Sequence, residues 1–269
     1  MKNVKLIMLD MDGTLFTNDK RITEKTRNCL MAMKDKGIAI AIATGRAIFN
    51  IERILREYQL EDVIEYVVGL NGVEITNRRN NTVEYHDQMS CEMTKDVYAK
   101  IQHTDMNVIT YTSKSAYARY DEPRVHKLCK NLQLPLQVYD YSKDTNTWNK
   151  VLIMRSYPFT KDECEYLLSM KNESYHGFLT DVDCYEIVNS NVSKASGIRV
   201  LCEELGITID EVMAFGDSGN DVDMLKAVGY GVVMANGSSE AKTVAKYQTL
   251  SNEEDGIAYF IEKYVGGNL

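Results

Sequence analysis

The sequence lacks both an apolar stretch long enough to cross a bilayer and a basic segment suited to nucleic acid or to an acidic membrane surface. The 269 residues carry a net charge of −8 at pH 7. Phosphate backbones and anionic lipids attract clusters of positive charge, so we expect neither nucleic acid nor a membrane as a partner. The apolar run after Asn3 is too short, and too soon followed by Asp10, for a signal peptide.

Paired cysteines are also lacking. The six cysteines are scattered, with no C-x-x-C pair and no neighbouring histidine; they are Cys29, Cys91, Cys129, Cys164, Cys184 and Cys202. Zinc sites need closely spaced ligands, so we expect reduced structural thiols and no zinc. These features together predict a soluble, cytoplasmic protein.

Proline and tryptophan are rare, and their placement is informative. All three prolines, the single tryptophan and most of the tyrosines lie between residues 84 and 188. Within this stretch, short apolar segments such as 108–111 and 150–154 alternate with helical patterns near 93–102, 124–132 and 161–170. We therefore predict an α+β domain at 84–188, inserted into a first domain formed by 1–83 and 189–269.

The flanking parts have the alternation of strands and helices typical of a parallel sheet. Apolar runs at 4–9 and 38–43 are each followed by a helical pattern, and the same order resumes from Lys194, with a buried strand at 211–215. Runs that are apolar throughout indicate strands covered on both faces. The predicted fold class is α/β, with a doubly wound, mostly parallel Rossmann-like sheet and an inserted α+β domain.

The first apolar run ends in Asp10-Met11-Asp12-Gly13-Thr14. Side chains two apart on an extended chain project to the same side, so Asp10 and Asp12 can face one crevice. Two such carboxylates repel each other unless a cation or a shared proton lies between them, and Mg²⁺ is the natural candidate. A D-x-D pair alone is weak evidence, because it also occurs in other metal-binding loops and in turns without function.

Other chemistry-bearing residues follow further strands of the same predicted sheet. Thr44 and Gly45 follow the second strand, Lys194 precedes a helix, and the 211–215 strand ends in Gly216-Asp217-Ser218-Gly219-Asn220-Asp221. Because the carboxyl ends of parallel strands meet at one edge, these side chains are expected to converge. Alone, Lys194 is more typical of a solvated lysine, and Asp217 and Asp221 of a loop that caps a helix.

In order and approximate spacing, these motifs resemble those of the haloacid dehalogenase-like (HAD) superfamily, and the insert resembles the type IIB cap of the Cof-like phosphatases. The C-terminal stretches 231–237 and 252–257 are similar to that subgroup's signature. The chain departs from the pattern at 189–191, where the subgroup often has proline and glycine, and at Gly237, where alanine is usual.

The resemblance implies a phosphatase that acts on a small phosphorylated metabolite through an aspartyl-phosphate. It implies Asp10 as nucleophile and Asp12 as acid and base, held protonated in the first half of the reaction. Thr44, Gly45, Lys194 and Asn220 would bind the phosphoryl group. Asp10, the Asp12 backbone carbonyl, Asp217 and, behind them, Asp221 would hold Mg²⁺.

Two alternatives stay open at this stage: a phosphosugar mutase of the same superfamily, and a regulator that binds a phosphorylated metabolite without turnover. The substrate is expected to be a sugar phosphate or a cofactor-related phosphate such as pyridoxal phosphate, with Glu186 and its neighbours as candidates for specificity. We treat Arg46 as structural and the four histidines, His86, His103, His126 and His176, as residues of the insert. The oligomeric state is not predicted.

Overall fold

The computed structural model describes residues 3–265, which divide into two units. One unit runs to His86 and resumes at Ser193; the other is the inserted segment Asp87–Val192. The junctions thus lie at 86/87 and 192/193, beside predicted junctions at 83/84 and 188/189. His86, placed in the insert by the predicted boundaries, is the last residue of the first segment of the core unit.

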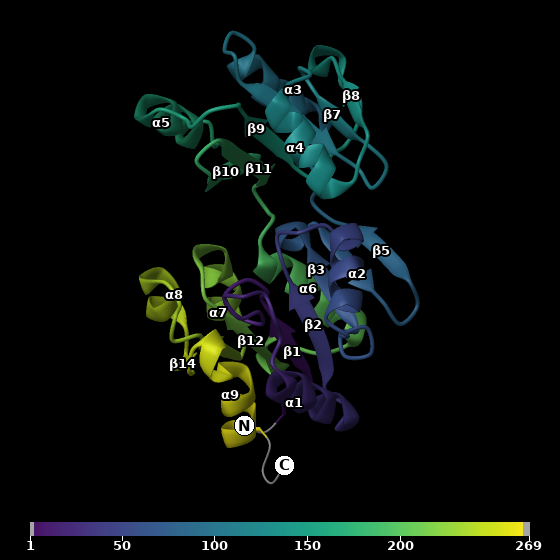
Figure 1. Ribbon diagram of the computed structural model, residues 1–269, viewed down its shortest axis with the longest axis vertical. Coiled ribbons are helices and arrows are strands. Elements are labelled where there is room, and N and C mark those ends of the chain that lie inside the picture. Colours follow the sequence, from purple (N-terminus) through teal and green to yellow (C-terminus); the bar gives the residue numbers. More distant parts are fainter. Residues whose placement is uncertain (1–2, 266–269) are drawn as a thin grey trace. The chain divides into compact units, whose positions relative to one another are not determined.

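The core unit is built on an eight-stranded sheet with the order β14-β13-β12-β1-β2-β3-β4-β5 (Figure 1). Its strands from β14 to β3 pair in parallel, while β4 and β5 are antiparallel additions at one edge. The strands are β1 Leu6–Leu9, β2 Ala39–Ala43, β3 Tyr66–Gly69, β4 Glu74–Asn77, β5 Thr82–Tyr85, β12 Val212–Gly216, β13 Tyr230–Val233 and β14 Tyr247–Gln248. The α-helices are α1 Glu24–Asp35, α2 Ile48–Glu57, α6 Lys194–Leu205, α7 Val222–Ala227, α8 Ser239–Val244 and α9 Gly256–Tyr264.

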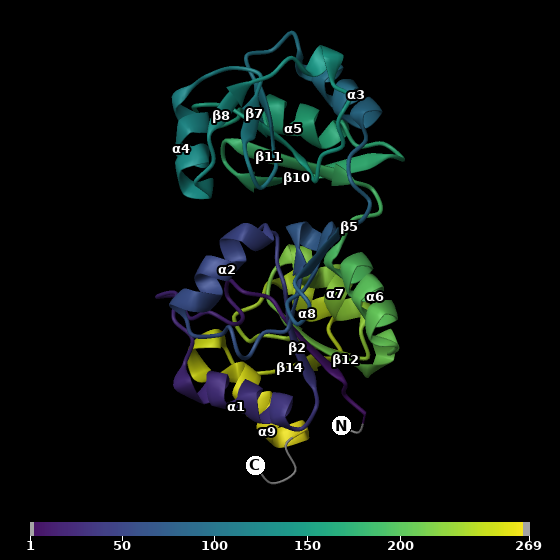
Figure 2. The ribbon, with the colours of Figure 1, turned by 90° about the vertical axis from the view of Figure 1, so that its right-hand side faces the viewer.

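Each face of this sheet is covered by helices, as the continuously apolar strands predict. Ile7 and Leu9 of β1 pack in one cluster with residues of α1, α2 and α9, and Leu6 and Met8 pack in another with α6 and α7. Helices α1 and α9 lie side by side in both views (Figures 1 and 2). Because β1 lies between β2 and β12, the residues that follow it emerge at the middle of the sheet edge.

Local sequence signals explain the start of α1 and the β3–β4 turn. Thr23 accepts a hydrogen bond from the backbone N–H of Thr26 and so caps α1. The turn at Asn71-Gly72 joins β3 to β4 in a hairpin, with positive φ angles of 58° and 120° at these two residues.

The inserted unit has a six-stranded sheet of order β10-β11-β9-β6-β7-β8, antiparallel except between β7 and β8. Residues of α3 and α5 pack with one face of this sheet in a separate core. Its elements are β6 Asn107–Tyr111, β7 Ala116–Ala118, β8 Leu136–Val138, β9 Val151–Met154, β10 Tyr175–Asp181, β11 Cys184–Asn189, α3 Cys91–Ile101, α4 Pro123–Leu132 and α5 Lys161–Ser169. Among residues 3–265, no helix has the length and apolarity needed to span a membrane.

A close approach of backbones fixes the start of α6. A Cβ on Gly197 would lie 2.5 Å from Val68 Cγ1 and 2.8 Å from Gly72 Cα. Glycine therefore lets α6 pack directly on the loop between β3 and β4. This contact also sets the position of Lys194, three residues earlier.

We expect Gly197→Ala to lower the free energy of unfolding by about 1–3 kcal/mol, because the added methyl group overpacks the contact. In a helix interior alanine is more favourable than glycine by roughly 1 kcal/mol. A net loss of stability in Gly197→Ala would therefore mean that the packing conflict outweighs this gain. Denaturant unfolding followed by circular dichroism measures it. Gly219→Ala is the control, because a Cβ there meets no heavy atom within 4 Å; equal stability of the two variants would contradict the prediction.

Candidate active site

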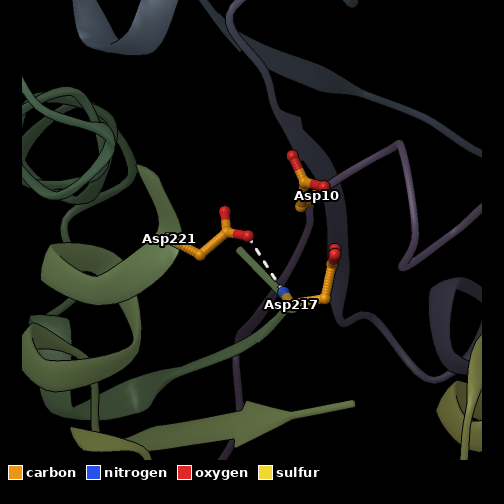
Figure 3. Close-up of side chains that lie close together, drawn as sticks. All are labelled: Asp10, Asp217 and Asp221. Carbon is orange, nitrogen blue, oxygen red and sulfur yellow. Dashed lines mark hydrogen bonds between the residues drawn. The ribbon is translucent and has the colours of Figure 1, made fainter. Parts of the chain in front are cut away.

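Three carboxylates meet at the carboxyl edge of the core sheet (Figure 3). Asp10 follows β1, Asp217 follows β12, and Asp221 ends the one-turn helix Gly219–Asp221. One oxygen from each lies within 4.8 Å of the others. Asp10 and Asp221 are buried, and Asp217 is partly exposed. Among the described residues this is the one such cluster of possible metal ligands, and it contains no histidine.

A buried ammonium joins two of these carboxylates. Lys194 Nζ lies 2.5 Å from Asp10 Oδ1 and 2.6 Å from Asp221 Oδ1, and the lysine side chain is fully buried. Lys194 is therefore not a solvated lysine at the start of a helix. A buried lysine keeps its charge only when it is paired, and here two carboxylates pair with it.

Asp217 and Asp221 also organise their own loop. Asp221 Oδ2 accepts hydrogen bonds from the backbone N–H groups of Asp217, at 2.9 Å (Figure 3), and Ser218, at 3.0 Å. Thr14 Oγ1 donates to Asp217 Oδ1 at 2.7 Å and so links this loop to the loop after β1. The capping interpretation of Asp221 is thus correct in part, since one carboxylate oxygen caps while the other binds Lys194.

Gly13 has no Cβ, and the Asp217 carboxylate occupies the space that a Cβ would fill. Its φ is +84°, a conformation that residues with a Cβ rarely adopt. A Cβ at this position would lie 2.5 Å from Asp217 Oδ2. The glycine after the D-x-D pair is therefore needed both for the turn and for the approach of the second acidic loop.

The carboxylate of Asp12 lies outside the three-carboxylate cluster. It accepts hydrogen bonds from Lys20 Nζ at 2.7 Å and from Arg46 Nη2 at 2.8 Å. Arg46 is therefore more than the structural residue expected, and Lys20 carried no signal in the sequence. Lys20 has a left-handed backbone with a φ of 60°.

The remaining predicted residues lie at strand or helix ends of the core unit. Thr44 is buried after β2, and its Oγ1 accepts a hydrogen bond from Arg46 N at 3.2 Å. A Cβ on Gly45 would lie 3.2 Å from the side-chain amide of Asn71. Asn220 is exposed, and its Oδ1 accepts a hydrogen bond from Ser218 Oγ at 2.6 Å.

The electrostatic environment shifts the pKa values of the two carboxyls of the D-x-D pair in opposite directions. Burial, together with the nearby carboxylates of Asp221 and Asp217, raises the pKa of Asp10 to about 7, although Lys194 acts to lower it. Burial also raises the pKa of Asp217. At Asp12 burial acts in the same direction, but Lys20 and Arg46 outweigh it, so the pKa of Asp12 lies below its ordinary value.

The donor set fits a hard divalent cation. All the candidate ligand atoms are oxygens, which such cations prefer. The raised pKa values of Asp10 and Asp217 mean that their anionic forms lack sufficient compensating charge. A divalent cation between them would supply it.

The sequence profile of haloacid dehalogenase-like hydrolases matches residues 7–261. The chain belongs to this family. YxeH of Bacillus subtilis (strain 168), whose name assigns it provisionally as a phosphatase, is 30% identical, with 97% of this chain and 98% of the relative covered. YitU of the same organism, a 5-amino-6-(5-phospho-D-ribitylamino)uracil phosphatase, is 27% identical over 96% of this chain and 97% of its own.

Solved structures agree with this assignment. The HAD subclass IIB sugar phosphatase BT4131 is 25% identical to this chain, and the two structures superpose with a TM-score of 0.79. The match covers 97% of this chain and 99% of BT4131. The predicted family and the predicted fold class, an α/β core with an inserted cap domain, are confirmed. This HAD-family protein is a phosphatase.

The raised pKa of Asp10 leads to a prediction about pH. An aspartate in the unfolded chain titrates near 3.9, whereas Asp10 titrates at about 7. Its contribution to stability is complete below the unfolded pKa and is lost as the pH rises through about 7. Below that pH a proton competes with a cation for the carboxylate.

We therefore expect MgCl₂ to raise the melting temperature more at about pH 8 than at about pH 5. Differential scanning fluorimetry with and without the salt measures the difference. In Asp10→Asn the pH dependence of the Mg²⁺ effect should become smaller, with a remainder from Asp217, whose pKa is also raised by burial. A Mg²⁺ effect in the wild type that is equal at both pH values would contradict the prediction.

Proposed function

We propose that this phosphatase hydrolyses a small phosphate monoester in a Mg²⁺-dependent reaction that passes through an aspartyl-phosphate. The observation that carries the proposal is the buried Lys194, whose ammonium bridges Asp10 and Asp221 beside Asp217. This arrangement supports the proposed roles of Asp10 as nucleophile, of Lys194 as the cation for the phosphoryl oxygens and of Asp217 as a metal ligand.

In this proposal Asp10 attacks phosphorus. A carboxylate nucleophile divides the hydrolysis into formation and breakdown of an acyl phosphate. Asp10 extends β1, and its backbone N–H donates to Phe215 O of β12 at 3.0 Å. The attacking residue therefore belongs to the rigid centre of the sheet, which favours a constant attack geometry.

Other residues bind the phosphoryl group and the metal. Lys194 supplies positive charge, and the Thr44 hydroxyl, the Gly45 backbone N–H and the Asn220 amide are proposed hydrogen-bond donors. The carboxylates of Asp10 and Asp217 and the Asp12 backbone carbonyl are the proposed Mg²⁺ ligands, with Asp221 behind them. Mg²⁺ supplies charge neutralisation of the phosphoryl oxygens when bound.

Asp12 is proposed as the acid when the aspartyl-phosphate forms and as the base when water hydrolyses it. Its pairing with Lys20 and Arg46 favours the ionised form, which removes a proton from the attacking water. The acid form is needed for departure of the alcohol. We propose that a bound phosphate dianion, by attracting these two cations, raises the pKa of Asp12 for that step.

The substrate class is proposed from the relatives and the insert. YitU and BT4131 are named for a phosphorylated ribityl compound and for sugar phosphates, which supports a sugar phosphate ahead of a cofactor-related phosphate such as pyridoxal phosphate. Residues 84–188 are the proposed cap domain. Within it Glu186, buried and bonded to Lys150 Nζ at 2.8 Å, is a proposed specificity residue.

The first test is phosphate release from a panel of sugar and cofactor phosphate monoesters, with Mg²⁺ and with chelator. Asp10→Asn should reduce the release by roughly a thousand-fold or more, because the nucleophile is lost. Circular dichroism should report an unchanged fold. Substantial activity in the variant would remove Asp10 as nucleophile, and isomerised sugar phosphate in place of free phosphate would identify a mutase.

A second test separates the role of Asp12 from that of Asp10. Asp12→Asn should lower kcat/KM for an alkyl phosphate about a hundred-fold or more, because an alkoxide needs a proton to leave. The leaving group of p-nitrophenyl phosphate is stable as an anion and needs no proton. For this substrate the loss of kcat/KM, which reports formation of the aspartyl-phosphate, should be much smaller. Equal losses of kcat/KM for both substrates would contradict the proposed acid.

A further inference from the structure

Two C-terminal stretches that the sequence singles out, 231–237 and 252–257, have no part in the chemistry proposed above. The structure places one asparagine from each beside the loop that follows β1. Asn236 precedes α8, and Asn252 begins the one-turn helix Asn252–Glu254. We call Asn236 and Asn252 the asparagine brace.

The brace binds the loop after β1 at two backbone carbonyls. Asn236 Nδ2 donates to Gly13 O at 2.8 Å, and Asn252 Nδ2 donates to Phe16 O at 2.9 Å. The two asparagines are also joined, since Asn252 N donates to Asn236 Oδ1 at 3.1 Å. Asn252 is buried, whereas Asn236 is exposed.

The segment that carries Asn236 binds the second acidic loop as well. Met234 N donates to Gly216 O at 3.0 Å, and Ser238 N donates to Asp217 O at 2.7 Å. A Cβ on Gly237 would lie 3.1 Å from the Asp217 carbonyl oxygen and 2.8 Å from Val233 Cγ2. Glycine, where the subgroup usually has alanine, thus permits this close approach.

These contacts make segment 234–238 a bridge between the loops of Asp10 and Asp217. On one side Asn236 fixes the Gly13 carbonyl, immediately before Thr14. Thr14 Oγ1 in turn donates to Asp217 Oδ1, and Ser238 N binds the Asp217 backbone from the other side. The position of the Asp217 carboxylate therefore depends on the relative position of these two loops.

We propose that Asn236 is a positioning residue for the metal site: by fixing the Gly13 carbonyl it holds Thr14 and Asp217 in the geometry that binds Mg²⁺. The inference rests on the proposed function, because it takes Asp217 as a metal ligand. Residues that orient metal ligands typically change metal affinity 10–100-fold when they are removed. A purely structural contact would change stability and leave metal affinity unaltered.

Asn236→Ala tests the proposal because Asn236 is exposed and its loss should leave the fold intact. Isothermal titration calorimetry with MgCl₂ should give a Kd about ten-fold higher than that of the wild type. In activity assays the Mg²⁺ concentration for half-maximal rate should rise by the same factor, with kcat at saturating Mg²⁺ close to the wild-type value. The melting temperature without Mg²⁺ should change little.

Asn77→Ala is the matched control. Asn77 belongs to the same unit, accepts a hydrogen bond from the backbone N–H of Arg79 and donates one to Glu204. Within residues 3–265 these side-chain hydrogen bonds do not reach the acidic cluster, so the Mg²⁺ Kd of the variant should equal that of the wild type. Asn252→Ala is a second variant: it should raise the Kd and also lower the melting temperature, because Phe16 O loses a buried partner.

An unchanged Mg²⁺ Kd in Asn236→Ala, with wild-type binding intact, would overturn the inference and leave the proposed function standing. An equal rise in Kd for Asn77→Ala would also overturn it, because the effect would then be general. If the wild type neither binds Mg²⁺ nor shows Mg²⁺-dependent turnover, the proposed function fails, and the role of Asn236 fails with it.

Discussion

The candidate site depends on one buried ion pair network, the ammonium of Lys194 between Asp10 and Asp221. Removing charges from water is costly, and such a network persists only where the charges compensate one another. Three carboxylates and one ammonium leave two negative charges in excess when all are ionised. The excess matches the charge of one divalent cation, in agreement with the all-oxygen donor set of the cluster.

The fold supplies the rigidity that this network requires. Asp10 continues the central strand β1, which pairs with β2 on one side and β12 on the other. Lys194 is fixed by the contact of α6 with the β3–β4 loop, where Gly197 and Gly72 admit no Cβ. The charged atoms are thus held by backbone packing, and the pairing of β1 with β12 brings together Asp10 and Asp217, which are far apart in the sequence.

Much of this arrangement is predictable from the sequence because it follows from strong local signals. The apolar runs give the strands, and polar residues at the end of each run mark the sheet edge where Asp10 and Asp217 lie. The contacts of Lys20, Arg46 and Asn236 are different. Each is a polar, exposed side chain, and its partner lies 8, 34 or 223 positions away, so no common periodicity or spacing indicates these contacts.

The position of Asp12 shows why those unpredicted contacts matter. The proposed acid must be protonated when the alcohol leaves, yet Lys20 and Arg46 favour the anion of Asp12. The two halves need opposite protonation states, so a permanent shift in either direction would slow one of them. In the proposed mechanism the exposed cations of Lys20 and Arg46 would resolve this conflict, because a phosphate dianion would compete for them when it binds and release them when it leaves. In that mechanism the central strand would hold the nucleophile Asp10, whereas exposed side chains would set the proton affinity of Asp12.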